Sequence, residues 1–67
     1  MRKNIDVRAL RQKLGMTQKQ FTIFGVSESS IRAWEAGKAT PRAYTQTLLK
    51  VIDAHPQMVL DAVRKVG

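Results

Sequence analysis

Apolar side chains recur at helical spacing in five short segments of this chain, and no segment alternates as a half-buried β-strand would. The first segment runs from Asn4 to Leu14, with Asn4 as its predicted N-cap and Gly15 as a left-handed stop. The second opens at Thr17, where Thr-Gln-Lys-Gln forms a capping box, and it ends near Gly25. This pattern predicts an all-α fold with short connections.

The third predicted helix covers residues 28–36, between an N-cap at Ser27 and a stop at Gly37. Ile31 and Trp34 lie three residues apart on one side of it, which indicates the face that meets the core. A tryptophan can also stack on a base, but its helical spacing from Ile31 favours a place in the core. The opposite side of this helix is polar, so we expect it to face outward.

Two more helices are predicted in the second half of the chain. Thr40 as a cap and Pro41 in the first turn start a helix that reaches Ala54. Its apolar stripe is wider than the core of so small a body needs, so part of it is expected to meet a partner. The stripe consists of Leu48, Leu49, Val51 and Ile52. A fifth helix is predicted over residues 56–65, with His55 as its cap, since a lone histidine has no partners for binding a metal.

Basic residues strongly outnumber acidic ones. Twelve Lys and Arg against five Asp and Glu give a formal charge of +7 on 67 residues, which predicts an anionic partner. The alternative is a basic surface that serves only solubility. The length allows one domain, residues 1–67. The absence of cysteine excludes disulfides and thiolate metal sites, and we expect no metal and no other cofactor.

Several functional classes are disfavoured by the sequence. No stretch approaches the roughly 18 consecutive apolar residues of a membrane helix, and the charged first residues do not lead into the apolar block of a signal peptide. We therefore expect no membrane contact and a place in the bacterial cytoplasm, at the nucleoid. The five acidic residues and one histidine offer no pair that could act as general acid and general base. The chain is therefore not expected to be an enzyme.

Three runs of sequence carry a family resemblance: LRQKLGMTQKQF, GVSESSIRAWEAGKATP and LLKVIDAHPQMV. They combine a turn glycine, a Trp-Glu-x-Gly motif and a proline four residues beyond that last glycine. The chain thus resembles the Xre family of helix-turn-helix regulators, which includes phage Cro and repressor proteins and HigA-type antitoxins. The resemblance implies a compact five-helix, lambda-repressor-like domain. It also implies a small repressor of a phage or mobile element, an antitoxin or an anti-CRISPR-associated regulator.

The exposed stripe of the third helix is the predicted base-reading surface. It consists of Glu28, Ser29, Arg32 and Ala33. A major groove about 12 Å wide admits one α-helix, and each base pair shows a distinct donor and acceptor pattern there. Arg32 is the strongest candidate, because its fork can bond both acceptors of a guanine and its neighbours are small. Glu28 can accept from a cytosine amino group, and Ala33 can touch a thymine methyl group.

A second set of residues is expected to contact the DNA backbone. It consists of Thr17, Gln18, Ser27, Lys38, Thr40 and Arg42. Thr17 and Ser27 stand at helix starts, where free backbone N–H groups attract phosphates. Gln18 resembles the family's glutamine that bonds the DNA backbone, although a simple helix-forming role is the alternative. Arg2 and Lys3 are expected to add a basic arm.

The resemblance also implies one structural contact and one local departure. Glu35 is implied to pair with Arg11 of the first helix and thereby to clamp the third helix, rather than to act in catalysis. Gly25 comes one position earlier than in the family pattern. Either the second helix loses a residue before the turn, or it rotates and repacks its last apolar residues. Those residues are Phe21, Ile23 and Phe24.

Two functions of different classes follow. The first is a sequence-specific repressor that binds an inverted repeat of double-stranded DNA as a homodimer and regulates its own operon. Its dimer interface is predicted on the fourth and fifth helices, at Leu49, Ile52, Met58, Val59 and Val63. The second is an antitoxin that uses the same apolar surface to hold a toxin, with DNA binding secondary. A stable dimer in the absence of partners favours the first.

Overall fold

The computed structural model describes residues 5–66, which form five α-helices and one 3₁₀ turn. The elements are α1 (Val7–Lys13), α2 (Gln18–Phe21), the 3₁₀ turn η1 (Thr22–Phe24), α3 (Glu28–Glu35), α4 (Ala43–Ala54) and α5 (Pro56–Val66). No strand occurs among these residues, so the expected all-α, five-helix class is confirmed.

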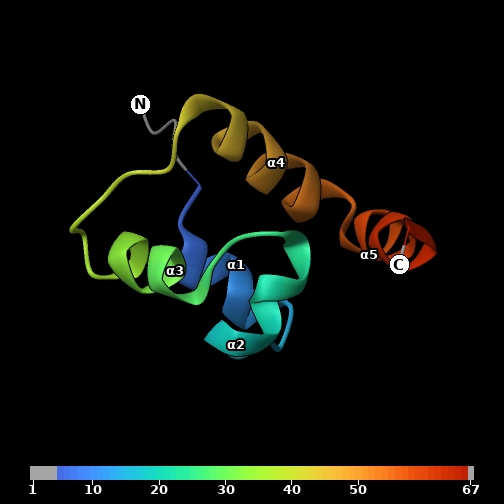
Figure 1. Ribbon diagram of the computed structural model, residues 1–67, viewed down its shortest axis with the longest axis horizontal. Coiled ribbons are helices and arrows are strands. Elements are labelled where there is room, and N and C mark those ends of the chain that lie inside the picture. The colour runs from blue at the N-terminus through green and yellow to red at the C-terminus, as the bar shows by residue number, and fades with distance from the viewer. Residues whose placement is uncertain (1–4, 67) are drawn as a thin grey trace.

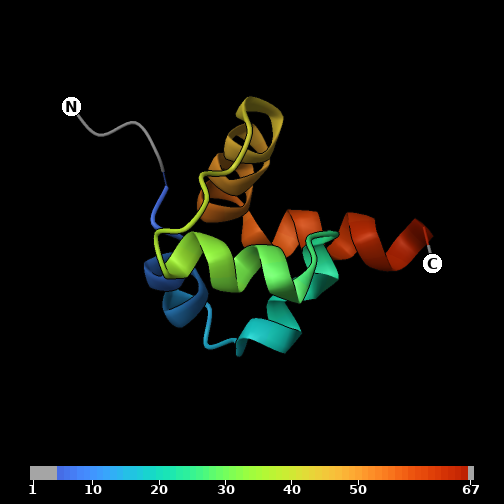
Figure 2. The same cartoon turned by 60° about the vertical axis from the view of Figure 1, so that its left-hand side comes forward.

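A single hydrophobic core joins α1, α2, η1, α3 and α4. Its buried side chains are Val7, Leu10, Phe21, Phe24, Ile31, Leu49 and Ile52. The fifth helix contributes only partly buried residues to this core, Val59 and Leu60. Figures 1 and 2 show α1, α2 and α3 gathered on one side of α4, while the last turns of α5 extend away from the other helices. Helix α5 is therefore the least enclosed element.

The first helix begins later than the sequence predicts. Its N-cap is Asp6, whose carboxylate accepts a hydrogen bond from the Ala9 N–H at 3.1 Å. Asn4 lies outside the described residues, but its predicted role as N-cap is wrong because the helix starts at Val7. The physical reason is a tertiary contact: the Ile5 N–H donates to Gln46 Oε1 of α4 at 3.3 Å, which holds this segment extended.

The fourth helix also starts later than expected. Thr40 does not cap it and Pro41 is not in its first turn; the N-cap position is Arg42, which has an extended backbone. After Gly37 the chain crosses from the end of α3 to the start of α4, and residues 39–42 cover this gap outside any helix (Figure 1). The Gln46 amide also donates to the Pro41 carbonyl at 3.5 Å. As predicted, α4 ends at Ala54 and α5 begins at Pro56.

Burial corrects the predicted dimer interface. Leu49 and Ile52 have no exposed surface in the chain itself, so they cannot meet a second copy, and that part of the prediction is wrong. The apolar stripe of α4 is wide because the core uses one side of it, while Val51 on its outer side is 44% exposed. On α5, Met58 is 67% exposed. Within residues 5–66, no helix combines the length and apolar character needed to cross a bilayer.

Candidate nucleic-acid interface

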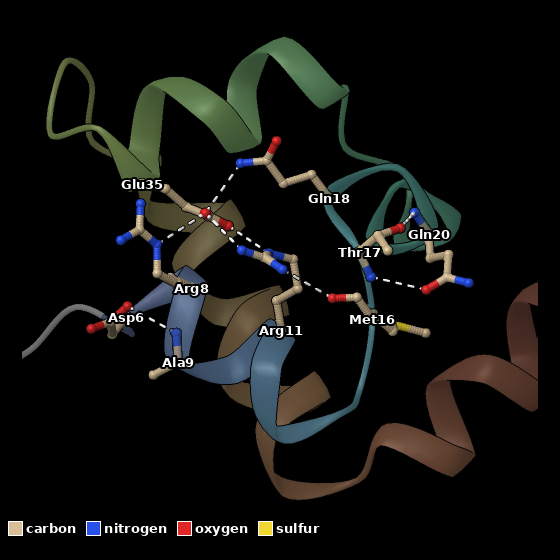
Figure 3. Close-up of polar contacts among 9 residues, drawn as sticks. All are labelled: Asp6, Arg8, Ala9, Arg11, Met16, Thr17, Gln18, Gln20 and Glu35. Carbon is tan, nitrogen blue, oxygen red and sulfur yellow. Dashed lines mark hydrogen bonds and ion pairs between the residues drawn. The ribbon is translucent and has the colours of Figure 1, made fainter.

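The second helix starts with the predicted capping box. Thr17 Oγ1 accepts from the Gln20 N–H at 3.0 Å, and Gln20 Oε1 accepts from the Thr17 N–H at 2.9 Å (Figure 3). These two bonds satisfy donors that a helix start otherwise leaves free. Thr17 remains exposed, so its side chain fixes the start of α2 at the protein surface.

The turn between α2 and α3 accommodates the early glycine by tightening the chain. Helix α2 ends at Phe21, and the next three residues form η1, whose geometry has fewer residues per turn. Gly25 then reverses the chain with a φ of +93°, a conformation that favours glycine. Phe21 and Phe24 are both buried and contact edge to face, with ring centroids 5.0 Å apart, whereas Ile23 is exposed. The segment before Gly25 therefore places Phe21 and Phe24 in the core and turns Ile23 outward.

The third helix is anchored on one side and exposed on the other. Ser27 is its N-cap, as predicted, and Ser27 Oγ accepts from the Ser30 N–H at 3.1 Å. Ile31 is fully buried, and Trp34 packs against the core while staying partly exposed. The expected core role of both residues is confirmed.

A buried carboxylate ties α3 to α1 and α2. The Glu35 side chain is only 2% exposed and accepts four hydrogen bonds (Figure 3). Arg11 binds it in two-pronged fashion, with Nε to Oε2 at 2.8 Å and Nη2 to Oε1 at 3.0 Å. Arg8 Nε and Gln18 Nε2 donate to Oε1 at 3.3 and 3.2 Å. Arg11 Nη1 also donates to the Met16 carbonyl at 3.0 Å, so the implied clamp by Arg11 is confirmed.

These contacts change the acidity of the carboxyl group. The hydrogen bond from Arg11 lowers the pKa of Glu35 to about 2, assisted by those from Gln18 and Arg8, while burial alone would raise it. Glu35 therefore carries a full negative charge at neutral pH and is surrounded by donors. Because a buried charge needs its partners, Glu35 serves to position α3 rather than to react.

We expect acid to weaken this clamp. A carboxyl group with a pKa of about 2 when folded and 4.5 ordinarily contributes stability that is complete above about pH 5 and lost as the pH falls through 2. Roughly 2 kcal/mol of it should be lost at pH 3. The check is urea unfolding of the parent and Glu35→Gln at pH 7 and pH 3. The difference in unfolding free energy between them should shrink at pH 3, and a constant difference would contradict the assignment.

The predicted base-reading residues lie on the outward side of α3. Arg32 and Glu28 form an ion pair one turn apart, with Nη1 and Oε2 separated by 3.1 Å. Their side chains are 57% and 39% exposed, so both are accessible despite the pairing. Ser29 is exposed and Ala33 is half-buried beside them. The small side chains of Ser29 and Ala33 therefore lie beside the exposed pair.

The predicted backbone-contact residues gather on either side of α3. One surface depression is lined by Gln18, Ser29, Arg32, Ala33 and Lys38, and another by Ser27, Thr40 and Arg42. Thr17 lines neither. The Gln18 amide is directed at Glu35, which is a structural role that neither reading of the sequence included. Arg2 and Lys3 lie outside the described residues.

The structure adds one cation that the sequence reasoning missed. Arg8 of α1 lines the same depression as Arg32 and Lys38, and its side chain is 58% exposed although Nε contacts Glu35. Its spacing contained a signal, since Arg8 precedes Arg11 by three residues and so lies on the same face of α1. A pair between Arg11 and Glu35 therefore also indicates that Arg8 lies near α3.

Two short capped helices joined by a tight turn, the second exposed on one side and packed into a small helical body on the other, define a helix-turn-helix domain. The model of one protein family, described as the antitoxin component of the bacterial toxin-antitoxin system, MqsA, matches residues 1–64. The chain belongs to this MqsA antitoxin family.

A named relative agrees with this assignment. Antitoxin MqsA of Escherichia coli strain K12 is 39% identical over 51 residues, which cover 75% of this chain and 39% of that protein. The chain therefore matches about two fifths of the length of this relative. The antitoxin part of the predicted resemblance is confirmed, but the family is MqsA and not specifically Xre, Cro or HigA. A family of antitoxins also supports the expectation that the chain is not an enzyme.

Proposed function

We propose that this chain is a sequence-specific DNA-binding domain that represses its own toxin-antitoxin operon. The observation that carries the proposal is the outward side of α3, where accessible Arg32 lies in one depression with Arg8 and Lys38. The same helix is fixed from behind by buried Ile31 and by the carboxylate of Glu35. A rigid helix with an exposed, basic face has the form needed to enter a major groove.

Base reading is assigned to the outward residues of α3. Arg32 has a planar fork that matches the O6 and N7 acceptors of guanine, and Glu28 accepts from the amino group of cytosine. Ser29 has a hydroxyl that donates or accepts, and Ala33 contacts a thymine methyl group. Since Arg32 and Glu28 pair in the free protein, DNA must separate them. An exposed pair at this spacing is worth only about 0.3–0.5 kcal/mol, so the separation costs little.

Affinity is assigned to residues around this helix. Lys38, Thr40 and Arg42 are exposed in the segment between α3 and α4, and we propose that they contact the sugar-phosphate backbone together with Arg8. Thr17 and Ser27 are exposed at the starts of α2 and α3, and we propose that they contact phosphate oxygens there. Gln18 is assigned a positioning role, because its amide supports Glu35 in the free chain.

Homodimer formation is proposed through the outer side of α4 and α5. Met58 and Val51 are exposed there, and Val59 and Val63 are half-buried. A second copy that covers these side chains removes apolar surface from water and places two α3 helices for an inverted repeat. Half-sites about one helical turn apart, near 34 Å, are expected. Residues 5–66 share one core, which supports a single domain. We propose that this domain acts in the bacterial cytoplasm.

The family description favours a second candidate function. The relative is named an antitoxin, so a toxin is a proposed partner of this chain, and the same apolar surface on α4 and α5 is available to it. Light scattering during size-exclusion chromatography separates the candidates. A stable dimer of the chain alone supports the repressor, whereas a monomer that becomes soluble and uniform only with the neighbouring gene product supports toxin binding.

The proposed function is tested by a gel shift with duplex DNA from upstream of the gene. The parent should bind this duplex at least 100-fold more tightly than a scrambled duplex of equal length at the same salt concentration. Lys38→Ala should weaken binding to both duplexes about equally and reduce the salt dependence by about one unit of slope. Equal affinity of the parent for both duplexes would contradict sequence-specific binding.

A further inference from the structure

An acidic residue on the proposed reading face should weaken affinity for DNA, because DNA is itself negatively charged. Glu28 places a carboxylate, 39% exposed, on the surface that would approach polyanionic DNA. Among residues 5–66, the cation bonded to it is Arg32, the residue expected to leave it for a base. When Arg32 leaves, the carboxylate of Glu28 is exposed to the groove without a partner.

We propose that Glu28 is a specificity-determining residue that acts mainly by penalising wrong sequences, an inference that rests on the proposed DNA binding. A carboxylate carries only acceptors, so it repels the O6 and N7 acceptors of guanine and the O4 of thymine. The amino groups of cytosine and adenine are the donors in the major groove, and the N7 acceptor beside the adenine amino group makes cytosine the better partner for a carboxylate. Wrong bases leave a desolvated charge without a hydrogen bond, which is the repulsive element that specific recognition requires.

The spacing of Glu28 and Arg32 along α3 lets the two side chains contact neighbouring base pairs at the same time. Residues four apart on a helix are separated by about 6 Å along its axis, which compares with 3.4 Å between stacked base pairs. Glu28 and Arg32 therefore reach base pairs about one or two steps apart. A guanine near a cytosine on the path of α3 satisfies both side chains at once, because one supplies acceptors to Arg32 and the other supplies a donor to Glu28. A site without a guanine leaves Arg32 without its two acceptors, and a site without an amino donor leaves Glu28 unsatisfied after their ion pair has opened.

A purely structural role for Glu28 makes a different prediction. An acid in the first turn of a helix favours the helix dipole, and the exposed pair with Arg32 adds a few tenths of a kcal/mol. If that were its whole role, replacement would lower the melting temperature slightly and leave DNA selection unchanged. The two roles are therefore separated by measuring selection and stability on the same variant.

The experiment is selection of duplexes from a randomised pool by the full chain, followed by sequencing, for the parent and Glu28→Gln. Glutamine keeps the shape and removes the charge, and its amide both donates and accepts. The parent should enrich a motif with a cytosine preferred at one position. Glu28→Gln should keep the guanine preference, and its preference for cytosine should fall about tenfold. It should also bind random duplexes more tightly than the parent does. Lys38→Ala, as the control, should keep the whole motif.

The outcomes distinguish this inference from the function on which it rests. If the parent enriches no motif, the proposed sequence-specific function is overturned together with the inference. If the parent enriches a motif and Glu28→Gln enriches the same motif with equal stringency, the role of Glu28 is overturned while the proposed function stands. Circular-dichroism melts of both proteins accompany the selection, and a variant that melts like the parent assigns the change in preference to DNA contacts.

Discussion

Replacing Glu35 by alanine is expected to lower the free energy of unfolding by about 3–5 kcal/mol. The carboxylate is 2% exposed and joins three helices through Arg11, Arg8 and Gln18. Its removal leaves the guanidinium of Arg11, itself only 15% exposed, without its charge partner. A chain of 67 residues has a total stability of only a few kcal/mol, so this loss should leave much of it unfolded at room temperature.

The measurement is urea unfolding at neutral pH followed by circular dichroism. The matched control is Glu28→Ala, which removes the same side chain from an exposed pair on the same helix and should cost about 0.5 kcal/mol or less. Glu35→Ala should also weaken DNA binding, but only through unfolding, so binding per folded molecule should be preserved. A variant as stable as the parent would refute the clamp.

The clamp explains how a short helix is held at a defined angle. Helix α3 has eight residues, too few for stability in isolation, and its orientation depends on tertiary contacts at both ends. The buried aromatic pair under the η1 turn fixes the end near Gly25, and Glu35 fixes the other. Mutations at either end should therefore destabilise the domain without touching the exposed face.

Local rules predicted most of the helix starts. Thr17 and Ser27 cap α2 and α3 as expected, because a hydroxyl one residue before a helix satisfies free N–H groups whatever the rest of the chain does. Gly15 also adopts the left-handed conformation expected of it. The outward position of the Arg32 stripe followed from helical periodicity. These features depend on neighbours within a few residues, which sequence patterns report directly.

The features that sequence patterns missed depend on contacts between distant residues. Asp6 replaces Asn4 as the first cap because Ile5 is tied to Gln46, which is 41 residues away. The stripe on α4 gave no indication of which side meets the core, and the burial of Leu49 excludes it from any interface between copies. The role of Gln18 was missed for the same reason, since its partner is contributed by another helix.

Replacing Arg32 by alanine is expected to cost roughly 1–3 kcal/mol of discrimination between the operator and scrambled DNA, about 5-fold to 160-fold in affinity ratio. The side chain is 57% exposed and forms an exposed ion pair with Glu28, so its removal should not unfold the chain. Truncation also leaves Glu28 facing the groove without a cation. Binding to the correct sequence should therefore suffer more than binding to random duplexes.

Arg32→Lys is the matched control for charge. Lysine keeps the positive charge but lacks the planar fork that bonds two acceptors of guanine. Non-specific affinity should stay close to that of the parent, while the ratio between operator and scrambled DNA should fall. If Arg32 only attracts phosphates, lysine should replace it fully, and the affinity ratio between operator and scrambled DNA should stay unchanged.

Sequence reading by α3 is tested most directly by the affinity ratio between upstream and scrambled duplexes, measured at one fixed salt concentration for the parent, Arg32→Ala and Arg32→Lys. We predict a high ratio for the parent and a ratio lowered by about fivefold or more for both variants, with all three proteins folded by circular dichroism. Equal ratios in the three proteins would show that Arg32 reads no base and would contradict the assignment of α3 as the reading helix.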